Sequence, residues 1–198
     1  MPSTPDHLAP LVSVGALKTG HFQLASGKHS GHYVQVGRLG EQPARLEEAL
    51  RQRLEEVRLL EVDTVFSAAI GGIVVGQQLA ALLGCRHVFA ERKDNVMLLR
   101  RGFEISAGER VLLVEDVVTT GGTLGELARL ASAAGALVPA AFTVIDRSSG
   151  RGGRGHPLIA CFSVDFPVYD PTSCPHCREG SPLVRPGSKK VVAPGQGG

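Results

Sequence analysis

Residues 111–135 restrict the fold more than any other segment of this 198-residue chain. Four consecutive apolar residues at 111–114 predict a buried strand, and the apolar spacing of LGELARLASAAG predicts a helix that ends at Gly135. A turn of threonine and glycine, 119–123, joins the two. Backbone N–H groups at a helix N-terminus and the helix dipole both favour a phosphate. The segment therefore predicts a strand, a turn and a helix that together bind an anion.

Two carboxylates, Glu115 and Asp116, follow directly after the apolar run. Acids at the end of a buried strand lower the stability of a fold unless a partner binds them. Beside a phosphate-binding turn they suit a ligand with hydroxyl groups or a metal ion, and a phosphorylated sugar fits that description. The alternative is an ordinary strand–turn–helix unit without a ligand. A nucleotide P-loop is excluded, because no G-x-x-x-x-G-K-[ST] sequence occurs in the chain.

The rest of the chain alternates strand and helix patterns. Apolar runs predict further strands over 62–70, 87–90, 137–146 and 159–164. PARLEEALRQRLEEVRLL predicts one helix entered at Pro43, with a buried face formed by Leu46, Leu50, Leu54 and Val57. Gly71-Gly72 predicts a turn before a helix that ends at Gly84. This alternation predicts an α/β fold whose central, mostly parallel sheet is flanked by helices.

The segments that follow the strands carry most of the polar chemistry. Because ligands gather at the carboxyl ends of parallel strands, we expect four of these segments to converge on one crevice: 69–72, 91–101, 115–123 and 146–155. Residues 91–109 predict a charged loop, and RSSGRGGRG at 147–155 predicts a flexible loop after Arg147. Near the N-terminus, apolar residues on either side of a turn at 26–31 predict two short strands.

Composition excludes several classes of protein. Hydrophobic residues make up 43% of the chain and charged residues 20%, as in ordinary globular proteins. A net charge of +2 is too small to indicate a nucleic-acid or membrane surface. No apolar run approaches the roughly 20 residues that span a bilayer, and the N-terminal sequence lacks the pattern of a signal peptide. We expect a cytoplasmic enzyme that acts on small molecules.

Four cysteines occur, at positions 85, 161, 174 and 177. Cys85 and Cys161 adjoin predicted strands, which indicates small core residues. Cys174 and Cys177 form C-P-H-C in a turn-rich segment. This pattern allows half a zinc site with His176, a redox pair, or reduced thiols in a local turn. Because no second C-x-x-C is present, we expect reduced thiols in a turn.

Several motifs resemble a known family. Residues 111–123 resemble the phosphoribosyl diphosphate (PRPP) signature of the type I phosphoribosyltransferases, with Glu-Asp where many members have Asp-Asp. Residues 15–36 resemble the N-terminal hood of the orotate phosphoribosyltransferases, IDR at 145–147 matches their apolar-Asp-Arg, and residues 169–189 resemble the tail of a short subgroup. ERKDNVMLLRRGFEI lies where that family has its mobile catalytic loop.

The resemblance implies the type I phosphoribosyltransferase fold in a single domain over 1–190. The hood would span about 7–40, the core about 41–168 and a C-terminal extension 169–190, with a flexible tail over 191–198. The family often has lysine in place of Ala25 and Gly71, and its loop usually contains a histidine that is absent here. A transferase for uracil or a purine therefore remains an alternative, as does a PRPP-sensing regulator.

The resemblance also implies roles for individual residues in transfer of a phosphoribosyl group from PRPP to orotate. Catalysis would rest on Glu115, Asp116, Arg92, Lys93, Arg100 and Arg101. PRPP would be bound by the two acids, by Val117, Val118, Thr119, Thr120, Gly121, Gly122 and Thr123, and by Ala69, Ile70, Gly71 and Gly72. Orotate would contact Thr119, Arg147 and Phe22. Mg²⁺ would be held mainly through PRPP, with no direct protein ligand, and a homodimer would share the loop of Arg100 and Arg101 across its interface.

Overall fold

The computed structural model describes residues 6–24 and 26–186, and contacts between Cα atoms divide the chain into two compact units. The first unit comprises residues 1–16 and 35–165, and the second comprises 17–34 and 166–198. Residues 17–34 of the expected hood thus cluster with the C-terminal extension, whereas residues 7–16 cluster with the core. The reason is that the strand of the C-terminal extension pairs with the N-terminal hairpin. The expected tail, 191–198, lies outside the described residues.

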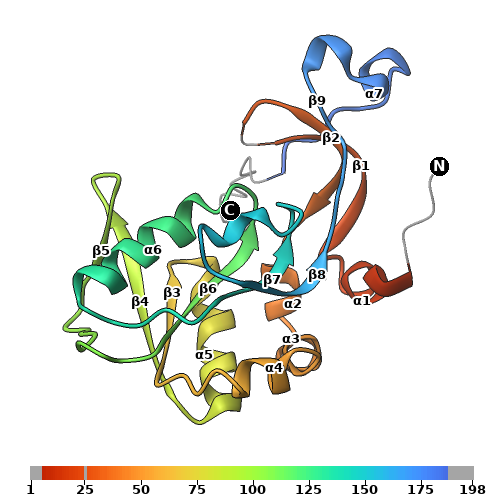
Figure 1. Cartoon of the computed structure of the whole chain (residues 1–198). Helices are drawn as coiled ribbons and strands as arrows, with labels where there is room; N and C mark the ends of the chain where they lie inside the picture. The colour runs from red at the N-terminus through yellow and green to blue at the C-terminus, as the bar shows by residue number, and fades with distance from the viewer. Residues whose placement is uncertain (1–5, 25, 187–198) are drawn as a thin grey trace, which may run out of the picture. The chain divides into compact units, whose positions relative to one another are not determined.

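The first unit is built on a six-stranded sheet with strand order β5-β4-β3-β6-β7-β8 (Figure 1). Its strands are β3 (Thr64–Ala68), β4 (Arg86–Lys93), β5 (Val96–Leu99), β6 (Val111–Val118), β7 (Ala141–Asp146) and β8 (Leu158–Ser163). All neighbours pair in parallel except β4 and β5, which form an antiparallel hairpin. The predicted parallel sheet is confirmed, and strands covered on both faces explain the continuous apolar runs.

Helices cover both faces of this sheet. α6 (Gly122–Ala133) packs on one face, where Phe66, Leu113 and Leu127 belong to one buried cluster. α5 (Gly71–Leu83) packs on the other face, where its Gly76 lies against Ser67. Because side chains alternate along a strand, Phe66 and Ser67 point to opposite faces. The remaining helices of this unit are α1 (Ala9–Ser13), α2 (Gly37–Gly40), α3 (Pro43–Arg51) and α4 (Leu54–Arg58), with the 3₁₀ turns η1 (Asp6–Leu8) and η2 (Arg151–Gly153).

Three expectations about local structure are wrong. The helix expected from Pro43 is interrupted at Gln52 and Arg53, although its four predicted apolar residues are all buried. The charged segment after residue 90 is not a loop at first, because β4 continues to Lys93 and turns back into β5. Gly71 and Gly72 open α5 instead of preceding it. In the second case, pairing between β4 and β5 overrides the local pattern.

The second unit contains a small antiparallel sheet with strand order β1-β2-β9. β1 (Leu17–Gln23) and β2 (His29–Val34) form the predicted hairpin, and β9 (Val168–Tyr169) pairs with β2 at His29 and Ser30. The 3₁₀ turn η3 (Pro171–Ser173) and the short helix α7 (Pro175–Arg178) follow. Across the described parts of both units, every helix is too short or too polar to cross a lipid bilayer.

Candidate active site

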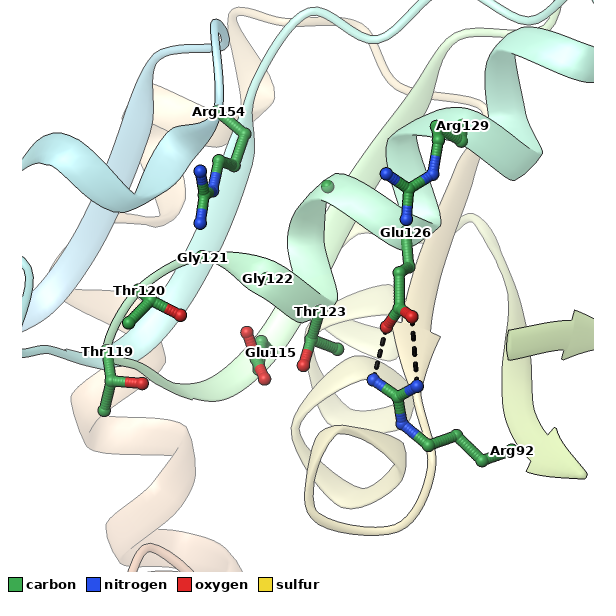
Figure 2. Close-up of a pocket in the computed structure, with 11 residues that line it drawn as sticks. Arg92, Glu115, Thr119, Thr120, Gly121, Gly122, Thr123, Glu126, Arg129 and Arg154 are labelled. Carbon is green, nitrogen blue, oxygen red and sulfur yellow. Dashed lines mark hydrogen bonds and ion pairs between the residues drawn. The ribbon is translucent and has the colours of Figure 1, made fainter. Parts of the chain in front are cut away.

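A cavity of about 490 Å³ lies at the carboxyl end of β6, within the first unit (Figure 2). It is bounded by the loop after β6, by the first turns of α6 and by the end of β4. Its lining residues are Arg92, Glu115, Thr119, Thr120, Gly121, Gly122, Thr123, Gly125, Glu126, Arg129 and Arg154. Three arginines and a helix N-terminus make this cavity suitable for an anion, and two glutamates make it suitable for hydrogen-bond donors.

The loop at 119–123 owes its shape to Gly121. This residue caps the N-terminus of α6 with a left-handed backbone, φ +73°, which favours glycine. A Cβ atom here would also lie far inside contact distance of the Gly152 carbonyl oxygen, so the backbones approach closely. The loop therefore presents the hydroxyl groups of Thr119, Thr120 and Thr123 together with the first amides of a twelve-residue helix.

The two acids of β6 point in opposite directions because they are adjacent in a strand. Glu115 lines the cavity, between Thr120 and Thr123 in the view of Figure 2. Burial raises the pKa of Glu115 to about 7 and the Asp116 charge adds to this, whereas a hydrogen bond from Thr123 and the charge of Arg92 act to lower it. Burial also raises the pKa of Asp116. Sequence analysis placed both acids after the strand, but β6 continues through them to Val118.

Asp116 faces Gly71, the first residue of α5. A Cβ atom at Gly71 would lie 2.3 Å from its Oδ2 atom, so any side chain at Gly71 would displace the Asp116 carboxylate. At Gly72, a Cβ atom would lie 3.3 Å from the Val114 carbonyl oxygen. Ile70, next to these glycines, is 84% exposed. The structure thus explains why glycine stands at position 71, and it brings the 69–72 segment to the second carboxylate of the motif.

Three arginines within or directly after the β4–β5 hairpin have acidic partners. Arg92 lines the cavity and pairs with Glu126 of α6, with 3.0 Å between Nη1 and Oε1. Arg100 and Arg101 both pair with Glu91, at 3.1 and 3.0 Å. The hairpin brings Glu91 opposite Leu98, which explains a pairing across nine or ten residues of sequence. Lys93 is exposed at the end of β4.

Sequence analysis missed two arginines of the cavity, Arg129 and Arg154. Arg129 projects from α6, and Arg154 points toward Thr120 and Gly121 (Figure 2). The segment that carries Arg154 was expected to be a flexible loop. It is ordered instead: Ser148 and Gly150 donate backbone hydrogen bonds of 2.7 Å to the Asp146 carboxylate, and a 3₁₀ turn follows. The glycine- and arginine-rich sequence was the signal that could have identified Arg154.

Of the three residues expected to contact orotate, Thr119 lines the cavity, whereas Arg147 and Phe22 lie in different units. Arg147 follows β7, and its backbone N–H donates to the Val118 carbonyl at 2.8 Å. Its half-buried guanidinium makes no hydrogen bond or ion pair with any described residue, and burial lowers its pKa. Phe22 belongs to the second unit, where its ring lies 5.7 Å from that of Tyr33. Arg147 is therefore a desolvated cation available to a ligand.

Comparisons with known proteins cover the whole of this site. A family model described as phosphoribosyl transferase domain matches residues 35–172, which include every residue that lines the cavity. The chain is 45% identical over 175 residues to the orotate phosphoribosyltransferase of Caldanaerobacter subterraneus, covering 88% of this chain and 92% of that protein. It is 44% identical over 179 residues to the orotate phosphoribosyltransferase of Thermotoga maritima, covering 90% of this chain and 96% of that protein. The crystal structure of orotate phosphoribosyltransferase from Aeropyrum pernix superposes with a TM-score of 0.69 at 26% identity, covering 79% of this chain and 93% of that one.

Proposed function

The chain belongs to the phosphoribosyl transferase family, among the orotate phosphoribosyltransferases, and we propose that it transfers the 5-phosphoribosyl group of PRPP to orotate. The products are orotidine 5′-monophosphate and diphosphate, as in the synthesis of UMP. One observation carries the proposal: a desolvated carboxylate, Glu115, lies beside a helix N-terminus in a cavity lined by three arginines. A ligand with both phosphates and hydroxyl groups satisfies all of these groups together.

The loop at 119–123 suits the 5′-phosphate of PRPP. Its threonine hydroxyls and the first amides of α6 are hydrogen-bond donors, and the helix dipole favours negative charge at this end. Arg154 points at the same loop and supplies a formal positive charge (Figure 2). Glycine at 121 and 122 lets a phosphate approach the backbone without a side chain in the way.

The two carboxylates suit the ribose. Hydroxyl groups at the 2′ and 3′ positions would donate hydrogen bonds to Glu115 and Asp116, and such bonds favour the charged form of a carboxylate. Both acids are partly shielded from water in the unliganded protein, which disfavours their charged forms. Binding of the sugar would give each carboxylate a hydrogen-bond donor and so offset this effect. Two negative charges beneath C1 of the ribose would then stabilise an oxocarbenium-like transition state electrostatically.

The residues at the cavity fit Mg²⁺ held mainly by the substrate. Among the described residues, no three acidic side chains gather near the cavity closely enough to hold a cation by themselves. Mg²⁺ is commonly bound through substrate phosphates with few protein ligands, which suits a cavity whose two carboxylates are assigned to the ribose. When bound, the ion neutralises charge on the departing diphosphate. The 69–72 turn, which faces Asp116, would receive the diphosphate on its backbone amides.

Arg147 is the residue that favours orotate over other bases. A guanidinium has the planar fork that binds a carboxylate, which orotate carries and which uracil and adenine lack. We therefore expect Arg147→Ala to raise the KM for orotate about tenfold or more, since a charged hydrogen bond contributes about 1.5–3 kcal/mol. The KM for PRPP should change little. Arg147→Lys keeps the charge without the fork and serves as the matched variant. A loss confined to PRPP affinity would remove Arg147 from the base site.

The raised pKa of Glu115 predicts how the stability of the unliganded protein depends on pH. Between its ordinary value of 4.5 and about 7, the folded state retains a proton that the unfolded state has released. The free energy of unfolding should therefore fall as pH rises through this range, by at most about 3.5 kcal/mol, since one pKa unit corresponds to about 1.4 kcal/mol. Urea denaturation at about pH 5 and about pH 8.5 measures the change.

Glu115→Gln should abolish most of that dependence and should make the unliganded protein more stable at the higher pH. Glu55→Gln is the control, because the Glu55 side chain is 82% exposed. Equal pH dependence in wild type and Glu115→Gln would show that Glu115 is ionised in the unliganded protein at neutral pH.

We further propose a homodimer in which the β4–β5 segment of one subunit closes over the diphosphate of the other. On closure, Arg100 and Arg101 would leave Glu91 and pair with the diphosphate. The diphosphate carries more negative charge than one carboxylate, so the new ion pairs would be stronger. Mixing Asp116→Asn with an Arg100→Ala/Arg101→Ala double variant should restore activity, because mixed dimers would contain one intact site. Failure to recover activity although subunits demonstrably exchange would confine these arginines to their own chain.

A further inference from the structure

Four side chains of the second unit form a compact set of metal-ligand atoms: His21 in β1, His29 in β2, Cys174 at the N-cap of α7 and Cys177 within α7. One nitrogen or sulfur atom of each lies within 4.8 Å of the corresponding atom of every other member. We propose that this His₂Cys₂ set is a structural zinc site that fastens the C-terminal extension to the N-terminal hairpin. All four residues belong to the same compact unit.

Four of the six separations between the ligand atoms lie close to those of tetrahedral zinc coordination, and all six are within 4.8 Å. With Zn–N of about 2.0–2.1 Å and Zn–S of about 2.3 Å, a tetrahedron places two nitrogens about 3.3 Å apart and a nitrogen and a sulfur about 3.6 Å apart. His21 Nε2 lies 3.0 Å from His29 Nδ1 and 3.6 Å from each of the two sulfur atoms. The Cys177 sulfur lies 3.3 Å from His29 Nδ1. Two nitrogens with two sulfurs in a tetrahedron favour zinc among the common divalent ions.

A hydrogen bond outside the set orients His21 for this role. Its Nδ1 atom lies 2.9 Å from the Ser181 carbonyl oxygen. A carbonyl oxygen only accepts, so Nδ1 carries the proton and Nε2 directs its lone pair toward the other three ligands. Histidines that bind metals usually have such a partner on the other ring nitrogen, which fixes the tautomer.

Burial gives a second reason for a metal. Three of the four ligands, His21, His29 and Cys174, are at most 4% exposed, whereas Cys177 closes the set on its exposed side. The described residues of this unit contribute only two other buried apolar side chains, Leu17 and Phe22. A three-stranded sheet with so little apolar core is the kind of structure that zinc stabilises, because metal binding contributes directly to folding. The ion would join two segments whose ligands lie as many as 156 residues apart in sequence.

The proposed site differs from the expectation for the C-P-H-C segment. Sequence analysis favoured reduced thiols in a local turn and considered His176 as a zinc ligand. His176 is not a member of the set, and its ring packs 5.5 Å from that of His21. The second pair of ligands comes from histidines of the hairpin, so a second C-x-x-C is unnecessary.

The experiment measures metal content of the full chain, purified without chelator and passed through a metal-free desalting column. We expect one zinc per chain by elemental mass spectrometry of the acid-digested protein. Cys174→Ser, Cys177→Ser, His21→Asn and His29→Asn should each lose it. The matched controls Cys85→Ser, Cys161→Ser and His176→Asn should keep it, since Cys85 and Cys161 lie outside the set.

Cobalt provides a second readout that uses the wild-type chain, so a variant that fails to fold leaves the proposal testable. Replacing zinc with Co²⁺ should give the intense visible bands of tetrahedral coordination and a sulfur-to-cobalt charge-transfer band. Removal of the zinc by a chelator should lower the melting temperature of the wild type and leave the apo forms of the four ligand variants unchanged. Wild type that is folded yet binds neither zinc nor Co²⁺ in this way, or that contains a Cys174–Cys177 disulfide when purified under reducing conditions, would overturn the proposal.

Discussion

Asp116→Asn should lower the turnover of orotate by about a hundredfold or more, a loss typical for removal of one electrostatic contact to a transition state. Stability should stay the same or increase, because burial raises the pKa of Asp116 and a neutral amide relieves that desolvation. The carboxylate has no ion pair with any described residue, so its expected partner is the ribose or the bound cation. The measurements are kcat at saturating PRPP and Mg²⁺ and the melting temperature.

Glu55→Gln is the matched control for Asp116→Asn, since it also neutralises a carboxylate, but one on the exposed surface of α4. It should leave kcat unchanged. A wild-type kcat in Asp116→Asn would remove Asp116 from the mechanism. A large fall in melting temperature would instead show that the carboxylate stabilises the fold.

Gly121→Ala should have the second large effect, on both stability and PRPP binding. The added Cβ atom would overlap the Gly152 carbonyl oxygen, and a backbone atom cannot rotate away as a side chain does. The loop at 119–123 must therefore move, which separates its amides from the position of the 5′-phosphate. We expect a loss of several kcal/mol in stability, as for other strained substitutions in a packed site, and a KM for PRPP raised by at least about tenfold.

Gly84→Ala separates the two causes of this effect. Gly84 has the same φ of +73° as Gly121, but a Cβ atom there meets nothing within 4 Å. Its substitution should lower the free energy of unfolding by about 1–2 kcal/mol, the strain of a left-handed backbone at alanine, and should not change PRPP binding. Equal destabilisation in the two variants would show that the contact with Gly152 does not hold the loop in place.

Features encoded within one short segment could be predicted from the sequence. The strand, the turn and the helix over 111–135 are adjacent in the chain, and Gly121 and Gly135 both have positive φ. The apolar face of 43–60 is also local, so its buried residues were predicted correctly although the helix breaks at Gln52. The spacing of the apolar residues does not reveal the break, because both α3 and α4 bury the residues that one continuous helix would have buried.

Features that depend on contacts between distant segments could not be predicted. The pairing of Arg100 with Glu91 requires the β4–β5 hairpin, which the charged sequence did not indicate. Arg154 reaches the cavity only because Asp146 orders the intervening loop. The His₂Cys₂ set joins residues from both ends of the chain, and neither pair alone specifies a zinc site.

Steady-state assays of the purified chain with PRPP and Mg²⁺, and with orotate, uracil or adenine offered separately, test the proposed activity most directly. We predict that orotate is consumed, that one diphosphate appears for each orotidine 5′-monophosphate, and that kcat/KM is far higher for orotate than for the other two bases. A folded protein that binds PRPP but turns over uracil or adenine more efficiently than orotate would contradict the assignment of Arg147 and with it the proposed substrate.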